Sequence, residues 1–127
     1  MTEALPLVVR GLVKTFPGPD GTPFAAVDHL DLELPAEGEL AAVVGPDGAG
    51  KTTLLRLLAG ILSPDAGSIS LFGLTPDTED ERFTHTVGFM PQKTGLYEEL
   101  TVFENFSLFG RLRGLAAHEL QSKFQEL

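Results

Sequence analysis

Residues 45–52 read GPDGAGKT. The five residues before them, LAAVV at 40–44, contain no polar member, which is typical of a strand buried on both faces in an α/β layer. The residues after them, TLLRLLAGI at 53–61, repeat leucine at helical intervals. The sequence therefore predicts a strand, a glycine-rich loop and a helix, in that order.

The glycine-rich loop matches the pattern G-x-x-x-x-G-K-[ST] at every fixed position, between the strand and the helix that this motif requires. Because polyphosphate carries dense negative charge, the loop must turn backbone N–H groups inward toward it. Side chains at Gly48 and Gly50 would obstruct the approach of the phosphate oxygens. The helix adds unpaired N–H groups and the positive end of its dipole. Lys51 supplies an ammonium for the β- and γ-phosphates, and the Thr52 hydroxyl is a hard oxygen ligand suited to Mg²⁺.

The predicted contacts of the triphosphate group lie in this loop and in the first helical turn. They are Gly45, Asp47, Gly48, Ala49, Gly50, Lys51, Thr52 and Thr53. Thr53 offers a further donor to the α-phosphate. Asp47 is unusual because a carboxylate repels phosphate, and we expect its side chain to point outward or to cap local N–H groups.

Two other interpretations of the loop are open to the same residues. A strand-to-helix turn that binds nothing would match the four fixed positions by chance with a probability on the order of one per cent. A dinucleotide-binding fingerprint would use Gly48 and Gly50 as its G-x-G, but Thr53 stands where the third glycine belongs. The triphosphate interpretation is therefore favoured.

The segment before the loop predicts a small antiparallel sheet. Residues 7–16 are rich in Val and Leu and end at PGPDG, residues 17–21, a cluster of turn residues that indicates a hairpin. Residues 27–34 alternate between leucines on one face and acidic residues on the other, as a half-solvated antiparallel strand requires.

The segment after the loop predicts further strands and helices. Residues 68–72 and 87–90 have the composition of short strands, and a polar, partly helical link is expected at residues 77–84. Apolar residues recur at helical spacing over 102–112. A last helix begins at residue 116 and meets no Gly or Pro terminator before residue 127, which predicts a truncated domain.

Composition excludes several classes of protein. A length of 127 residues with 43% hydrophobic content fits one domain or part of one. The net charge of −9 argues against binding to nucleic acid or to an anionic membrane. Without cysteine there is no disulfide or thiolate metal site, and His29, His85 and His118 stand apart from one another and from any motif. The start resembles no signal peptide, and no run approaches the roughly 20 apolar residues of a membrane span.

Beyond the loop, the order of segments resembles the ATP-binding domains of ABC transporters. The matching stretches are PDAGSI at 64–69, VGFMPQ at 87–92 and GLYEELTVFEN at 95–105, and the last is especially similar to ATPase subunits of ABC-2-type exporters. The resemblance implies an α/β fold: a P-loop NTPase core with a partial parallel sheet and helices, preceded by a small antiparallel β subdomain. Residues 1–127 would be the N-terminal part of one such domain, with the antiparallel region over 1–40, the P-loop core over 41–92, and the glutamine loop and start of a helical subdomain over 93–127.

The resemblance also assigns roles to residues outside the loop. Phe16 corresponds to the aromatic residue that stacks on adenine, although a strand-end phenylalanine is also an ordinary core residue. Gln92 corresponds to the glutamine that completes the Mg²⁺ shell or contacts the attacking water, so Lys51 and Gln92 are the predicted catalytic residues, and Thr52 and Gln92 the predicted metal ligands. Leu96 and Tyr97 are candidate contacts of a membrane partner.

The family's remaining machinery is missing from the sequence, because no apolar strand ends in Asp-Glu and no serine-glycine signature occurs. The chain alone is therefore expected to be inactive. The resemblance implies ATP and Mg²⁺ as cofactors, an ABC-2-type permease and a second, head-to-tail ATP-binding domain as partners, no nucleic acid partner, and a cytoplasmic position at the inner face of the plasma membrane. A soluble ABC ATPase without a transport role and a nucleotide-binding module without hydrolysis are the alternatives.

Overall fold

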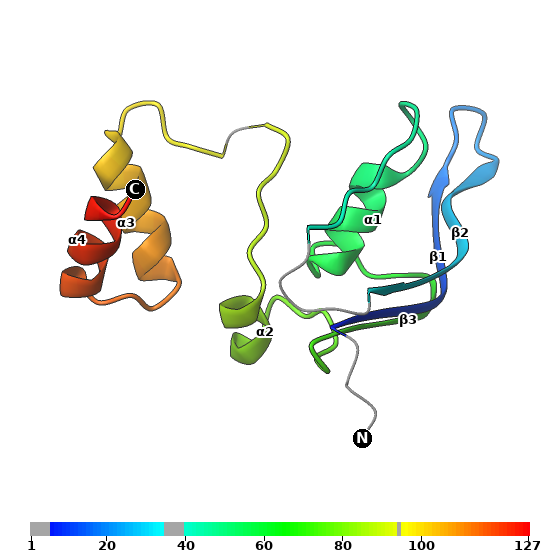
Figure 1. The fold of residues 1–127 in the computed structure, drawn as a ribbon. Coiled ribbons are helices and arrows are strands. Elements are labelled where there is room, and N and C mark those ends of the chain that lie inside the picture. The colour runs from blue at the N-terminus through cyan, green and yellow to red at the C-terminus, as the bar shows by residue number, and fades with distance from the viewer. Residues whose placement is uncertain (1–5, 35–39, 94) are drawn as a thin grey trace, which may run out of the picture. The chain divides into compact units, whose positions relative to one another are not determined.

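The computed structural model describes residues 6–34, 40–93 and 95–127. Its elements, drawn in Figure 1, are β1 (Leu7–Pro17), β2 (Pro23–Leu34), α1 (Lys51–Leu58), β3 (Ala66–Leu71), α2 (Glu81–Thr86), α3 (Val102–Leu112) and α4 (Ala117–Gln125). The chain divides into two compact units, Met1–Val87 and Gly88–Leu127.

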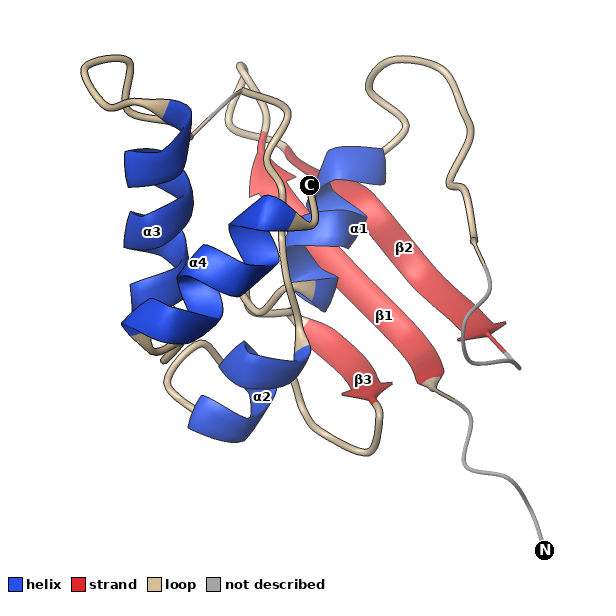
Figure 2. Ribbon diagram, turned by 60° about the vertical axis from the view of Figure 1, so that its left-hand side comes forward, coloured by secondary structure: helices blue, strands red, loops and turns tan. Residues whose placement is uncertain are grey.

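The first unit contains a three-stranded sheet in the order β2-β1-β3, in which both neighbours run antiparallel to β1 (Figure 2). Val9 in the central strand stands opposite Leu32 on one side and Ile69 on the other. The hairpin between β1 and β2 closes where the Gly18 N–H donates to the Thr22 carbonyl at 2.8 Å. The predicted antiparallel sheet and its hairpin are confirmed.

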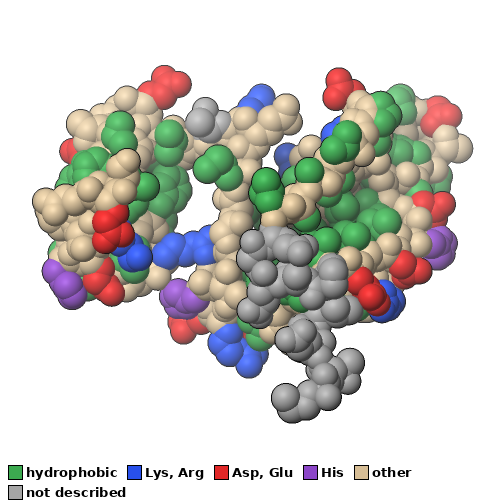
Figure 3. All heavy atoms as spheres, in the orientation of Figure 1, with side chains coloured by type: hydrophobic (Ala, Val, Ile, Leu, Met, Phe, Trp, Pro, Cys, Tyr) green, Lys and Arg blue, Asp and Glu red, His purple; other side chains and the backbone are tan. Residues whose placement is uncertain are grey.

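The core of the first unit lies between the sheet and α1. It consists of Leu7, Val9, Leu12, Val27, Leu54, Leu57 and Ile69. Leu7 and Val9 alternate along β1 and so point to one face of the sheet, and Leu12 joins this face beyond a register shift. Leu54 and Leu57, three residues apart, share one face of α1, so both elements bury apolar side chains in one core. In Figure 3 hydrophobic side chains gather where α1 meets the sheet, and acidic side chains lie along the outer edge by β2.

Two predicted strands are absent from the described residues. Residues 40–44 are irregular rather than a buried strand, with Leu40 fully exposed and Val44 91% exposed. Residues 87–90 are likewise irregular, and Met90 is 92% exposed. A strand buried on both faces needs neighbouring strands to pair its main-chain groups, and the described sheet pairs β1 with β2 and β3 alone. The described residues therefore contain the predicted antiparallel sheet without the parallel part of the predicted α/β fold.

The second unit is built from α3 and α4. The predicted helix over 102–112 is confirmed, and it starts with a capping box in which Thr101 and Glu104 bond each other's backbone N–H groups. Asn105 is buried, and its side-chain amide bonds the backbone N–H and carbonyl of Tyr97. The Phe103 and Phe124 rings join the helices edge to face, with centroids 4.9 Å apart. The predicted last helix forms, but it ends at Gln125 instead of continuing through residue 127.

Candidate nucleotide-binding site

The glycine-rich loop passes into α1 through a left-handed residue. Gly50 is the N-cap of α1 and has a φ of 95°. A Cβ added there would lie 2.1 Å from the carbonyl oxygen of Ala26 in β2, so only glycine lets the end of the loop pack against this strand. The glycine that the motif requires at position 50 is thus explained by the close approach of the loop backbone to the backbone of β2.

Lys51, the first residue of α1, folds back over the loop that precedes it. Its ammonium donates to the carbonyl oxygens of Gly45 and Pro46, each at 2.6 Å. These bonds occupy two of the three ammonium donors and hold the charge inside the loop. Phosphate oxygens could replace the carbonyls as acceptors, because charge-assisted bonds to an anion are stronger than bonds to neutral carbonyls.

The first turn of α1 offers an uncrowded N-terminus. It contains no acidic residue, and Gly50 provides no side-chain cap, so no carboxylate of this helix competes with an anion for its first N–H groups. Thr52 in this turn is exposed and Thr53 is half-buried. Asp47 lies in the exposed part of the loop.

A cavity of about 260 Å³ adjoins the loop. It is lined on the loop side by Ala49, Gly50 and Lys51 and on the β2 side by Ala26, Val27 and Asp28. The cavity therefore lies where the loop, the first turn of α1 and the sheet meet.

Phe16 lies at the far end of β1 and does not line this cavity. Its half-buried ring pairs with that of Phe24 across the hairpin, with centroids 6.2 Å apart. The ammonium of Lys14 lies 5.7 Å from the Phe16 ring centroid. The Phe16 ring is therefore held in place by its neighbours in the sheet. That this ring stacks on adenine stays a prediction.

Asp65 is a polar residue whose contacts were not predicted, although it stands in the PDAGSI stretch. Its carboxylate accepts from the Thr15 backbone N–H at 2.7 Å, from the Thr15 hydroxyl at 2.8 Å and from the Lys14 ammonium at 3.1 Å. The Thr15 N–H, then its hydroxyl, then Lys14 lower the pKa of Asp65 to about 2. A negatively charged Asp65 thus stabilises the end of β1 that carries Phe16.

The other predicted residues belong to the second unit. Gln92 lies in an exposed, irregular segment, and its catalytic and metal-binding roles stay predictions. Leu96 and Tyr97 are about half exposed, at 56% and 53%.

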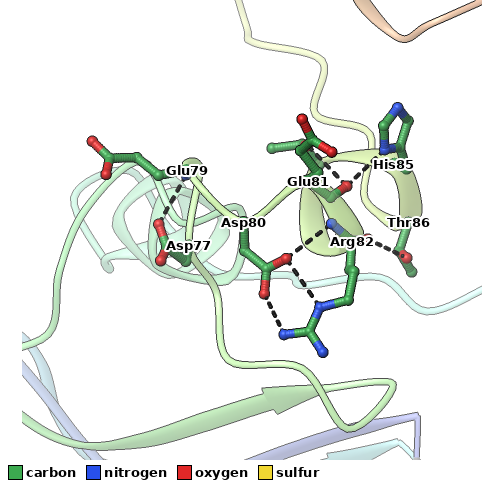
Figure 4. A network of polar contacts seen from close by, with 8 residues as sticks. Asp77, Glu79, Asp80, Glu81, Arg82, His85 and Thr86 are labelled. Atoms are coloured by element: carbon green, nitrogen blue, oxygen red, sulfur yellow. Dashed lines mark hydrogen bonds and ion pairs between the residues drawn. The ribbon is translucent and has the colours of Figure 1, made fainter.

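The acidic run before α2 is used for local hydrogen bonding (Figure 4). Asp80 caps α2 by accepting from the Arg82 backbone N–H at 2.9 Å, and it also pairs with the Arg82 guanidinium at 2.8 Å. His85 bonds the backbone carbonyl of Glu81 through Nδ1. In the part of the chain that the structure describes, no three His, Cys, Asp or Glu residues are grouped as a metal site.

Comparison with known proteins identifies the family. The ABC transporter family matches residues 27–127. The whole chain is 46% identical to the probable multidrug ABC transporter ATP-binding protein YbhF of Escherichia coli, of which it covers 21%. It is 47% identical over 96 residues, 76% of its length, to the Nod factor export ATP-binding protein I of Burkholderia thailandensis, of which it covers 31%. Over 105 residues, 83% of its length, it is 45% identical to the sulfate/thiosulfate import ATP-binding protein CysA of Bordetella pertussis, covering 28% of that protein.

Solved structures share the fold. The ATP-binding cassette MJ0796, solved as a dimer bound to ADP and Pi, has a TM-score of 0.77 at 23% identity, over 94% of this chain and 54% of that one. An ATP-binding subunit of an ABC transporter has a TM-score of 0.73 at 27% identity, over 91% of this chain and 45% of the other. None of the described helices is long and apolar enough to cross a membrane. The chain spans between a fifth and a third of the length of the curated relatives named above, and it belongs to the ABC transporter ATP-binding family, of whose domain it represents the N-terminal portion.

Proposed function

We propose that this chain is the phosphate-binding part of an ABC-type ATPase that couples ATP binding and hydrolysis to the export of a small molecule through a partner membrane domain. The observation that carries the proposal is the position of Lys51, whose ammonium is held inside the glycine-rich loop by two carbonyl oxygens. The loop thereby keeps a positive charge at the place where its motif receives the β- and γ-phosphates.

The site supports binding of the triphosphate at the start of α1. The oxygens of the β- and γ-phosphates would accept from the first N–H groups of the helix and from Lys51. Mg²⁺ would be held at the same place by oxygens of the triphosphate together with the exposed Thr52 hydroxyl, which is a hard oxygen donor. When bound, Mg²⁺ would neutralise part of the phosphate charge, and Gln92 would be its second protein ligand or the residue that orients the attacking water.

The rest of the catalytic machinery would lie outside residues 1–127. The sequence has no apolar strand ending in Asp-Glu and no serine-glycine signature, so we propose that the chain alone does not turn over ATP. In the intact protein, residues 1–40 would form the antiparallel region, 41–92 the P-loop core, and 93–127 the glutamine loop and the start of the helical subdomain.

The proposed partners are a second ATP-binding domain, packed head to tail, and an ABC-2-type permease. The dimeric state of MJ0796 and the transport roles in the names of the relatives support this assembly. Export is supported by the likeness of residues 95–105 to exporter subunits, although relatives named as importers also match. The permease would hold the protein at the cytoplasmic face of the membrane, and the net charge of −9 disfavours a nucleic acid partner.

The test replaces Lys51 by alanine in the intact protein. Because Lys51 would stabilise the charge that develops on the phosphates, we expect ATP turnover to fall by about 100- to 1,000-fold, with a loss of MgATP affinity. Lys123→Ala, which removes a lysine of α4, is the matched control and should leave both quantities unchanged. Steady-state hydrolysis and calorimetric titration measure them, and full turnover by Lys51→Ala would refute the proposal.

A further inference from the structure

The pairing of β1 with β3 stops short of Phe16. Its last paired residues are Val13 and Ala66, whereas β1 continues to Pro17. The pairing of β1 with β2 is also irregular here, with register shifts on either side of Lys14. The end of β1 that carries Phe16 therefore pairs with β2 alone, where Phe16 stands opposite Phe24, and the register shifts around Lys14 separate it from the rest of β1.

Asp65 continues the hydrogen bonding directly before β3 begins. Its backbone N–H donates to the Val13 carbonyl at 2.9 Å, and its carboxylate accepts from the Thr15 backbone N–H at 2.7 Å. These two bonds replace the pair that another strand residue would make with an antiparallel neighbour. One aspartate thus extends the order of the sheet by two residues, up to the residue before Phe16.

The same carboxylate also fixes the cation beside the ring. Lys14 exposes only 17% of its side chain, and its ammonium lies 3.1 Å from Asp65 and 5.7 Å from the Phe16 ring centroid. A cation at this distance attracts the negative face of an aromatic ring. Asp65 therefore acts on Phe16 through two routes, the backbone of Thr15 and the side chain of Lys14.

We propose that Asp65 is a positioning residue for the adenine end of the nucleotide site. By holding Thr15 and Lys14 it fixes the orientation of Phe16, so that the ring is ordered before the base arrives. This inference rests on the proposed function, in which Phe16 stacks on adenine. A ring that is already ordered loses less conformational entropy on binding, which raises the affinity for the base.

The test compares two ligands in the intact ATPase: MgATP, which has a base, and magnesium tripolyphosphate, which has none. Phe16→Ala should weaken MgATP binding by about 5- to 100-fold, as expected for the loss of a stacking partner, with KM rising more than kcat falls. Asp65→Ala should weaken MgATP binding by about 3- to 10-fold, which is less than the loss of the whole ring in Phe16→Ala. Both variants should leave the tripolyphosphate affinity unchanged.

Asp31→Ala is the matched control. Asp31 also accepts a backbone N–H of β1, that of Gly11 at 2.7 Å, but five residues before Phe16. This variant should leave the affinity for both ligands unchanged. Asp65→Asn, which keeps an acceptor for Thr15 and loses the charge opposite Lys14, should fall between the wild type and Asp65→Ala, and it replaces Asp65→Ala if that variant does not fold.

The double variant Phe16→Ala/Asp65→Ala decides whether Asp65 acts through the ring. If it does, the double variant binds MgATP no more weakly than Phe16→Ala alone. Additive losses, or equal losses of MgATP and tripolyphosphate affinity with Asp65→Ala, would overturn the inference. An unchanged MgATP affinity in Phe16→Ala would overturn the adenine role of Phe16, and the inference with it. If Phe16→Ala loses MgATP affinity but Asp65→Ala does not, the inference about Asp65 alone is overturned.

Discussion

Residues 40–44 and residues 45–52 follow each other in the chain, but they differ in how much of their structure is determined by contacts between residues close in sequence. The loop is fixed by contacts over short sequence distances, namely the bonds from Lys51 to Gly45 and Pro46 and the left-handed turn at Gly50. The apolar segment before it has the composition of a buried strand, yet Leu40 and Val44 stay exposed. Most bonds that hold the phosphate-binding loop thus lie within it, and the approach of Gly50 to Ala26 is its contact with β2, whereas a central strand depends entirely on neighbours that pair with it.

The largest expected effect concerns the end of the loop at Gly50. Gly50→Ala combines a φ of 95° with a Cβ that would meet the Ala26 carbonyl at 2.1 Å, so we expect the free energy of unfolding to fall by about 3 kcal/mol or more. MgATP binding should be lost with it. Denaturant unfolding and calorimetric titration of the intact protein measure both effects.

Gly48→Ala is the control for this substitution. Gly48 also has a positive φ, of 79°, but an added Cβ would meet nothing within 4 Å. We expect the free energy of unfolding to fall by about 1 to 2 kcal/mol, which is the cost of holding a residue with a Cβ at a positive φ. Equal losses in the two variants would show that the close approach of the loop to β2 is not what fixes Gly50.

A smaller effect is expected in the apolar segment. In the 127-residue chain Val44 is 91% exposed, so Val44→Asn should change the free energy of unfolding by less than about 0.5 kcal/mol. In the intact protein we expect residues 40–44 to be paired and buried, and the same substitution should cost about 2 kcal/mol. Denaturant titrations of both proteins make the comparison, and equal losses would contradict the proposed burial.

The smallest effect is the pH dependence that comes from Asp65. Its pKa is lowered from 3.8 to about 2 in the folded chain by Thr15 and Lys14, so the unfolded chain binds a proton more readily than the folded one. The stabilisation is fully present above about pH 4 and is lost as the pH falls from 3.8 toward 2. Thermal unfolding between pH 7 and pH 2 measures it, and the wild type should lose its advantage over Asp65→Asn only in the acid range. A difference that vanished already between pH 7 and 5 would contradict this assignment.

The elements that could be predicted from sequence are those with local determinants. The helix over 102–112 was predicted to the residue because it has apolar periodicity, and the structure adds the capping box of Thr101 and Glu104. The alternation of leucine and acidic residues over 27–34 predicts the second part of β2, which begins four residues earlier, at Pro23. The strands predicted at 40–44 and 87–90 do not form among the described residues. Their apolar composition favours burial, but a strand also needs a neighbouring strand to pair with.

The candidate site shows the same division. The motif predicts the loop, but only the three-dimensional structure shows that the Lys51 side chain folds back onto two carbonyl oxygens of the loop. The bonds between Asp65 and Thr15 join residues 50 positions apart, so no local pattern could reveal them. The one available signal was that an aspartate stands in the PDAGSI stretch directly before a predicted strand.

The most direct test of the central claim is a crystal structure of the intact protein with Mg²⁺ and a non-hydrolysable ATP analogue. We predict that the Lys51 ammonium leaves the carbonyls of Gly45 and Pro46 and contacts the β- and γ-phosphates, with the first N–H groups of α1 directed at the same oxygens. A nucleotide bound elsewhere, with Lys51 still on its two carbonyls, would contradict the account.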